Sequence, residues 1–190
     1  KKLRLLNIAL VDVGAGTSDI AISSNDSISA YGMVPMAGDE VTEAIVQNFL
    51  VDFNTAEKIK IATSKGENIE FVDVLGIENE ATVEDVEKVI KPVVDKIAEE
   101  IGEKIIELNG GRAPNAVFLV GGGAHTPYFK ESLGETLGLI DKRIAIKSRD
   151  AVIECVGYDE SLGSAGVTVL GIALVAIKKS GHDFIDIILN

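Results

Sequence analysis

Eight consecutive residues near the start of the chain have the types that bind a phosphate group: Asp12-Val13-Gly14-Ala15-Gly16-Thr17-Ser18-Asp19. The glycines let a backbone approach a ligand closely, and successive backbone N–H groups can surround an anion. The two hydroxyls add donors, and Asp12, at the end of an apolar segment, is placed to hold a metal-bound water. The string is neither a dinucleotide fingerprint nor a P-loop, because it lacks a third glycine and a Gly-Lys-Ser/Thr sequence. A ligand-free hairpin turn is the competing interpretation, and the full string favours phosphate binding over it.

Two weaker patterns could bind the rest of a nucleotide. Gly121-Gly122-Gly123 follows the apolar segment Ala116 to Val120, and small residues at such a junction let a flat ring or a sugar lie against the backbone. Many strand–helix junctions carry glycine, so a ligand-free junction explains this pattern at least as well. Glu57 and Lys60 share a helix face, where a carboxylate can bond ribose hydroxyls and a lysine stem can lie along an adenine. Taken alone, these two residues are better explained as a solvated ion pair.

Apolar periodicity divides the chain into alternating strands and helices, which indicates an α/β fold. Strands are predicted at residues 5–13, 20–24, 28–34, 69–75, 116–120, 143–146 and 184–189. Helices are predicted at residues 39–53, from a cap at Asn54 or Thr55 to residue 62, at 83–108, at 128–137 and at 167–178. Thr82 with Asp85 resembles a capping box, and Pro92 should kink the following helix or mark a restart.

The composition is that of a globular protein, with 190 residues, 46% of them hydrophobic and 25% charged. The net charge of −12 argues against a nucleic-acid groove, which must attract phosphates. The single cysteine, Cys155, excludes an internal disulfide framework and fits a reducing compartment. The longest apolar run, Gly166 to Ile177, is shorter than the roughly 20 residues of a spanning helix, so no direct membrane segment is predicted. Because the chain lacks an initiating methionine and ends in an apparent strand, we expect a fragment of a longer protein.

Together the three patterns resemble the actin, heat-shock-chaperone and sugar-kinase ATPase superfamily. The string at residues 12–19 is similar to its second phosphate motif, and Val120 to Ala124 is similar to its adenosine motif. Within the superfamily, Met36 to Thr42 followed by Ala56 to Ile61 is similar to FtsA, a bacterial cell-division branch. The segment Val167 to Ala173 is similar to the same branch, with valine in place of the usual proline. The resemblance covers nearly the whole chain, but only the second lobe of a two-lobed fold.

The pattern and the resemblance together predict a ribonuclease-H-like, actin-like ATPase lobe. Its sheet would be mixed, with about five strands, three antiparallel and then two parallel, and with helices on both faces. Residues 1–58 and 112–180 would form the core of the lobe, and residues 59–111 a smaller inserted subdomain. Residues 181–190 would begin a following domain.

The resemblance implies ATP and Mg²⁺ as ligands. Asp12 would be the catalytic residue and would lie near Mg²⁺ through its water. The residues implied to bind the nucleotide are Gly14, Ala15, Gly16, Thr17, Ser18, Glu57, Lys60, Gly121, Gly122 and Gly123. The first phosphate motif and the catalytic residue of the other lobe are absent from this sequence. We therefore expect ATPase activity only in the full-length protein, since two lobes must close to exclude water.

Three functions fit this resemblance. The first is the ATP-binding lobe of an FtsA-like actin homologue in cell division, cytoplasmic, with a parent protein at the membrane. The second is a nucleotide-binding adaptor or scaffold without turnover, as in pilus assembly. The third is the ATPase core of a small-molecule kinase or of a reactivating chaperone. In each case a protein partner or self-association would act through the full-length protein.

Overall fold

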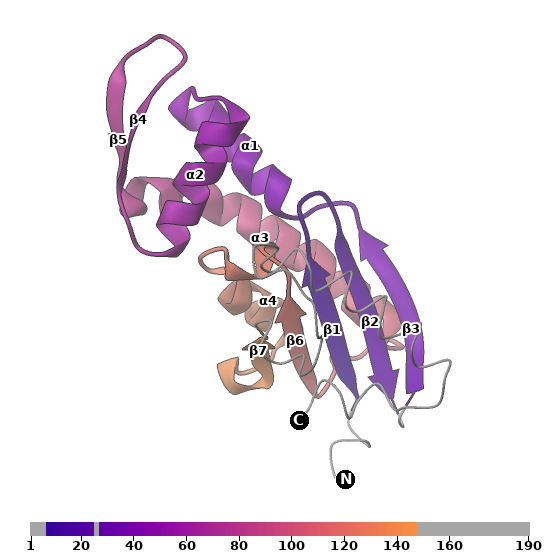
Figure 1. The fold of residues 1–190 in the computed structure, drawn as a ribbon. Coiled ribbons are helices and arrows are strands. Elements are labelled where there is room, and N and C mark those ends of the chain that lie inside the picture. The colour runs from indigo at the N-terminus through magenta and orange to yellow at the C-terminus, as the bar shows by residue number, and fades with distance from the viewer. Residues whose placement is uncertain (1–6, 25–26, 148–190) are drawn as a thin grey trace, which may run out of the picture.

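The computed structural model describes residues 7–24 and 27–147, and its centre is a five-stranded sheet (Figure 1). The helix predicted at 167–178, the strand at 184–189, the FtsA-like segment at 167–173 and Cys155 lie outside the described residues. The strands are β1 (Ile8–Val13), β2 (Ser18–Ser24), β3 (Ser27–Val34), β6 (Ala116–Val120) and β7 (Ile144–Ile146).

The strand order is β3-β2-β1-β6-β7. The pairs β1–β2 and β2–β3 are antiparallel, whereas β6 runs parallel to β1, and β7 runs parallel to β6. The predicted mixed sheet of three antiparallel strands followed by two parallel ones is confirmed. Because β1 and β6 are parallel neighbours, the segments that follow their carboxyl ends leave the same edge of the sheet.

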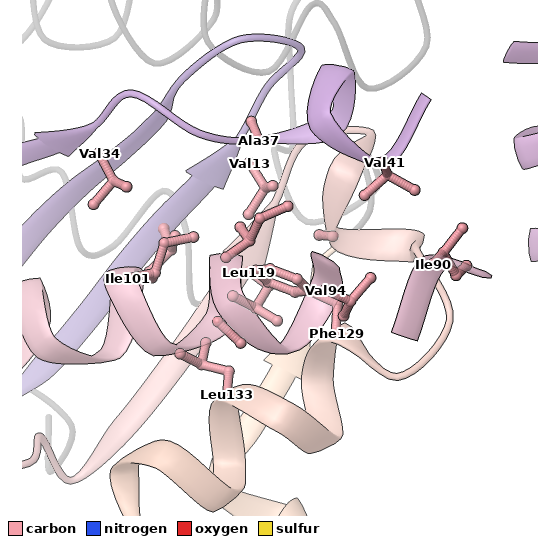
Figure 2. Close-up of a cluster of buried hydrophobic side chains, with 14 of the residues drawn as sticks. Val13, Val34, Ala37, Val41, Ile90, Val94, Ile101, Leu119, Phe129 and Leu133 are labelled. Carbon is pink, nitrogen blue, oxygen red and sulfur yellow. The ribbon is translucent and has the colours of Figure 1, made fainter. Parts of the chain in front are cut away.

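Two helices, α3 (Val83–Leu108) and α4 (Phe129–Leu137), bury one face of this sheet. Burial alternates along β1 and β2, as expected for strands with one closely covered face. Figure 2 shows Val13 and Leu119 of the strands in one cluster with Ile101 of α3 and with Phe129 and Leu133 of α4. The core therefore fixes the carboxyl end of β1, where the phosphate-type string begins.

Two further helices follow β3. Helix α1 (Gly38–Phe49) ends at Leu50, which has a left-handed φ of 52°. Helix α2 (Phe53–Ser64) begins after Asp52, whose carboxylate accepts hydrogen bonds from the backbone N–H of Thr55 at 3.1 Å and from its hydroxyl at 2.8 Å. These bonds lower the pKa of Asp52. The predicted helix at 39–53 was therefore too long, and the cap is Asp52, not Asn54 or Thr55.

A two-stranded hairpin, β4 (Ile69–Val72) with β5 (Glu78–Ala81), follows α2. The strand predicted at 69–75 ends earlier because Asp73 folds the chain into a turn. The Asp73 carboxylate accepts hydrogen bonds from the N–H groups of Leu75 and Ile77, both at 2.9 Å. Strand β5 is not predicted by the apolar pattern, because its residues Glu-Asn-Glu-Ala do not alternate between apolar and polar.

Helix α3 is one continuous helix of 26 residues that joins the hairpin to the sheet (Figure 1). The hydroxyl of Thr82 accepts the N–H of Asp85 at 3.2 Å, so the predicted start is confirmed. The predicted restart at Pro92 is not found: the helix continues, with Ile90 and Val94 fully buried on either side of the proline. That burial offsets the hydrogen bond that Pro92 cannot donate. Among the described residues, neither α3 nor another helix has the length and apolar character needed to cross a membrane.

The hairpin, α1, α2 and the first half of α3 lie at one end of the molecule, and the five-stranded sheet lies at the other (Figure 1). The second half of α3 packs against β3, where a Cβ atom on Gly32 would lie 2.7 Å from Cδ1 of Leu108. Helix α3 is thus shared by both ends. The division of the chain into a core and an inserted subdomain at residues 59–111 stays a prediction.

Helix α4 begins after Tyr128, a bulky residue with a left-handed φ of 66°. Its hydroxyl donates a hydrogen bond to the Glu87 carboxylate at 2.6 Å, and this bond raises the pKa of Tyr128. The Lys91 ammonium lies 5.6 Å from the centre of the tyrosine ring. These contacts with α3 hold the side chain in place at a backbone conformation that costs an L-residue about 1 kcal/mol.

We expect the Tyr128→Gly variant to be more stable than the Tyr128→Ala variant. In most helices and strands the alanine variant is the more stable of the two. Both Tyr128→Gly and Tyr128→Ala lose the ring and its contacts, but only glycine adopts a positive φ without cost. Urea denaturation should give Tyr128→Gly a free energy of unfolding about 1 kcal/mol higher than that of Tyr128→Ala. At exposed Lys88, inside α3, the same pair should show alanine ahead by a similar amount. A Tyr128→Ala variant as stable as Tyr128→Gly would contradict the left-handed conformation.

Candidate functional site

The turn between β1 and β2, residues 14–17, is docked on the start of α1. The N–H of its first residue donates to the carbonyl of its last at 3.0 Å, which closes the turn. The carbonyl oxygens of Gly14 and Ala15 accept hydrogen bonds from the N–H groups of Gly38 at 3.1 Å and Asp39 at 2.8 Å. The turn is therefore held through its oxygen atoms.

The backbone N–H groups of residues 15–17, unlike that of Gly14, are not used within the turn. Residues 15–17 are exposed, and within the described part of the chain their three successive N–H groups have no hydrogen-bond acceptor. Successive free N–H groups in a tight turn bind anions. The structure thus supports the phosphate interpretation of the string with donors that the fold itself does not use.

Ser18 occupies a different environment from the rest of the string. Its side chain is fully buried, and its hydroxyl donates to the carbonyl oxygen of Met36 at 2.8 Å. This bond ties the start of β2 to the segment that precedes α1. Thr17, next to it, is exposed. A contact between Ser18 and a nucleotide stays a prediction.

Asp12 and Asp19 lie directly opposite each other on β1 and β2. Mg²⁺ is typically held by one or two carboxylates together with waters and substrate phosphates. No group of three or more potential metal ligands occurs among the described residues. The carboxylate pair therefore fits Mg²⁺.

The glycine run after β6 lies against the end of β1. Asp12 is the register partner of Val120, so the residues that follow the two strands come together. Gly121 has a φ of 88°, and a Cβ atom there would lie 2.5 Å from Oδ1 of Asp12 and would overlap the carbonyl oxygen of Val13. A Cβ atom on Gly123 would lie 2.5 Å from Cγ1 of Val13. The two glycines are needed for this close approach.

Gly122 has an ordinary conformation, with φ −65°, and precedes a short 3₁₀ turn, η2 (Gly123–His125). Residues other than glycine also adopt this conformation. A role of Gly122 in binding a nucleotide stays a prediction.

Glu57 and Lys60 form a partly buried ion pair on α2. The Lys60 ammonium lies 2.5 Å from Oε1 of Glu57, with side-chain exposures of 16% for Lys60 and 33% for Glu57. The ammonium also donates to the hydroxyl of Thr42 at 2.7 Å and to the carbonyl of Gly38 at 3.1 Å. The same Oε1 accepts a bond from the Thr42 hydroxyl. This network replaces the solvated ion pair that the two residues suggest when read alone.

Gly38 joins this ion pair to the β1–β2 turn. A Cβ atom on Gly38 would lie 3.2 Å from the carbonyl oxygen of Gly14 and 3.4 Å from Nζ of Lys60. A continuous set of contacts therefore runs from Gly121 through Asp12 and the turn to Gly38 and Lys60. The structure brings together all three patterns found in the sequence, which are separated by up to about a hundred residues.

Sequence reasoning missed Gly38 and Thr42 as parts of this site. They lie four residues apart at the start of α1, where the Thr42 hydroxyl oxygen is 3.0 Å from the Gly38 carbonyl oxygen, so its single proton is shared between this carbonyl and the Glu57 carboxylate. Their spacing places them on one helix face, and a glycine at a helix start permits a close approach of another backbone.

Known proteins resemble this chain in sequence and in fold. The family model of cell division protein FtsA matches residues 9–167. FtsA of Buchnera aphidicola is 36% identical over 105 residues, which cover 55% of this chain and 24% of that protein. MreB5 of Spiroplasma citri, solved with bound AMPPNP, has a TM-score of 0.62 at 21% identity and covers 95% of this chain and 56% of that one. The PilM–PilN type IV pilus biogenesis complex has a TM-score of 0.63 at 18% identity, over 93% of this chain and 47% of that one.

These matches differ in what they show. The two solved structures have an actin-like ATPase fold that this chain shares, and the predicted fold class is confirmed. The chain spans about a quarter of the length of the Buchnera protein. The family model covers most of the chain, including all three patterns of the site. The chain belongs to the family of cell division protein FtsA.

Proposed function

We propose that this chain is the ATP-binding lobe of an FtsA protein that acts in cell division, with Mg-ATP held between it and a second lobe. The observation that carries the proposal is the meeting of three patterns at one place: the β1–β2 turn, the glycine run after β6 and the Glu57–Lys60 pair. A turn with unused N–H donors, a run of glycines beside the end of β1 and a paired carboxylate suit the three parts of a nucleotide.

Each group in the site has a proposed task. The free N–H groups of residues 15–17 bind the β- and γ-phosphates, and the hydroxyl of Thr17 adds a donor. Asp12, with Asp19 opposite, holds the waters of Mg²⁺, which when bound would neutralise charge on the phosphates. Gly121 and Gly123 leave room for the adenosine against the backbone.

The Glu57–Lys60 pair is proposed to bind the ribose through Glu57 alone. The three ammonium donors of Lys60 are already engaged by Glu57, Thr42 and Gly38, so Lys60 positions its neighbours. The second carboxylate oxygen of Glu57, Oε2, has no hydrogen bond among the described residues. It is therefore available to accept a ribose hydroxyl.

We place ATP hydrolysis, if the parent protein performs it, in the closed two-lobed protein, because exclusion of water needs both lobes. We also place the protein in the cytoplasm, with its partner contacts or self-association made through the full-length chain. Steady-state phosphate release by the full-length protein separates an ATPase from a nucleotide-binding adaptor without turnover.

The binding test is a titration of Mg-ATP into the isotope-labelled 190-residue chain, followed through backbone amide shifts. Shifts should cluster at residues 14–19, 57–60 and 121–124, because these segments form one surface. Shifts scattered over the hairpin and α4, or none in either this chain or the full-length protein, would overturn the proposal.

Asp12→Asn should remove the effect of Mg²⁺ on nucleotide binding. The amide keeps the size of the carboxylate but loses the charge that holds the cation. We expect Mg-ATP affinity to fall roughly tenfold, about 1.4 kcal/mol, while the affinity for ATP without metal stays the same or rises. Isothermal titration with and without Mg²⁺ measures both values. Glu43→Gln, an exposed change on α1, is the control and should keep the full Mg²⁺ effect.

A further inference from the structure

Within residues 7–24 and 27–147, strand β3 is an edge of the five-stranded sheet and has unusually little protection. Among the described residues its only strand partner is β2. Its eight residues, Ser-Ile-Ser-Ala-Tyr-Gly-Met-Val, include no charge. Edge strands are normally short, charged, interrupted by a bulge or covered, because a free edge pairs with other chains. A register shift affects only the first half of β3, opposite Ile22 and Ser23, so residues 30–34 form a regular, uncharged edge.

The two faces of this edge differ in character. Gly32 and Val34 face α3: a Cβ on Gly32 would meet α3, and Val34 is 5% exposed. Tyr31 therefore faces the opposite side, where it is 65% exposed; Met33, which is 50% exposed, follows the same alternation but also borders the groove on the α3 side. The edge presents large apolar side chains on one face of the sheet.

An acidic groove runs beside the same edge on the α3 side. It has a volume of about 410 Å³ and is lined by Met33, Val34, Pro35, Glu100, Glu103, Lys104 and Glu107. Lys104 pairs with Glu107 at 2.8 Å. Glu100 and Glu103 have no cationic partner in the described part of the chain. The groove therefore carries two uncompensated negative charges.

We propose that β3 receives an extended, basic segment of a partner protein as a sixth strand of the sheet. Backbone pairing with residues 30–34 supplies the affinity, since an unpaired strand edge binds an extended peptide through its main chain. Side chains of the added strand alternate between the faces. Lysine or arginine on the α3 side meets Glu100 and Glu103, and apolar side chains on the other side pack beside Tyr31 and Met33. The edge thus selects a segment in which basic and apolar residues alternate.

Charge favours such a segment over a second copy of this chain. Two copies joined edge to edge through β3 would bring their α3 helices to the same side of one sheet, with Glu100 and Glu103 of each facing those of the other. Each copy also carries a net charge of −12. Like charges facing each other across an interface oppose association.

The test uses an acetylated and amidated nine-residue peptide of alternating lysine and valine, added to the 190-residue chain. Backbone hydrogen exchange should slow at alternate residues between 30 and 34. A peptide of alternating glutamate and valine, which reverses the charge, should bind at least tenfold more weakly. The lysine–valine peptide with alternate amides N-methylated, which cannot pair through its backbone, should also bind at least tenfold more weakly. Equal binding of the N-methylated peptide would exclude strand addition. Protection that grows with protein concentration in the absence of peptide would assign the edge to a second copy instead.

Charge reversal in the groove provides the second measurement. The double variant Glu100→Lys/Glu103→Lys should weaken binding of the lysine–valine peptide at least tenfold. Glu70→Lys/Glu78→Lys, on the exposed faces of the β4–β5 hairpin, makes the same change in net charge far from β3 and is the matched control. Equal losses in both double variants would show attraction to net charge only and would overturn the proposal.

Discussion

Gly121→Ala should destabilise the chain and abolish tight nucleotide binding. The added Cβ would be placed 2.5 Å from Oδ1 of Asp12 and against the carbonyl oxygen of Val13, at a backbone φ of 88°. Both atoms that it meets belong to the end of β1, which is held in the sheet by β2 and β6. The junction must therefore move away from Asp12. We expect the free energy of unfolding to fall by about 3 kcal/mol, from the clash and the strained φ together.

Gly110→Ala separates the clash from the backbone strain. Gly110 also has a positive φ, 68°, but a Cβ there would meet nothing within 4 Å. Its alanine variant should lose only about 1 kcal/mol and keep full affinity for Mg-ATP. Urea denaturation and isothermal titration on both variants measure the difference. Equal losses of stability and affinity at the two positions would mean that the contact between the glycine run and Asp12 has no part in binding.

Lys60→Met should have the second largest effect. Methionine keeps much of the side-chain volume but removes an ammonium that satisfies Glu57, Thr42 and the carbonyl of Gly38. Removing one partner leaves a partly buried carboxylate without its cation. Glu57 is one-third exposed, so water screens part of this loss, and we expect about 2 kcal/mol in the free energy of unfolding. Nucleotide affinity should fall as well, because Gly38 supports the β1–β2 turn.

The matched control is Lys88→Met on α3. Lys88 pairs with Glu84 at 2.9 Å, but both side chains are well exposed. An exposed pair of this kind contributes little, so the change should cost less than about 0.5 kcal/mol. If Lys60→Met cost no more than Lys88→Met in urea denaturation, the network around Gly38 would not hold the turn. Glu57→Gln should show an intermediate loss, since the amide still accepts a hydrogen bond.

The sheet could be predicted from the sequence because its signals are local. Strands β1, β2, β3, β6 and β7 are short apolar segments bounded by glycine or polar turns, and their order of antiparallel and parallel pairing was anticipated correctly. The cap at Thr82 was recognisable for the same reason, since a hydroxyl three residues before a carboxylate is a local pattern. The position of the cap before α2 was wrong because Asp52, Asn54 and Thr55 are all good caps in one short stretch.

The parts that could not be predicted depend on contacts between distant residues. Gly121 and Asp12 are far apart in the chain, and their close approach follows from the register of β1 with β6. Gly38 belongs to the site because the β1–β2 turn packs on the start of α1, a contact that the sequence does not reveal. Strand β5 has no apolar pattern that would predict it. It is stabilised by its pairing with β4 in the hairpin. Pro92 stays inside a helix because the burial of its neighbours outweighs one missing hydrogen bond.

Because α3 is one unbroken helix, a small rotation at one of its ends moves the other end further. At 1.5 Å per residue, its 26 residues extend about 39 Å from the hairpin to the contact with Gly32 of β3. Its last turn is wedged against the sheet, where Leu108 meets Gly32, while its first turn carries the β4–β5 hairpin. A tilt of about 5° at the sheet would therefore swing the hairpin end through about 3 Å. A small tilt of α3 where it meets the sheet would thus become a larger movement of the hairpin.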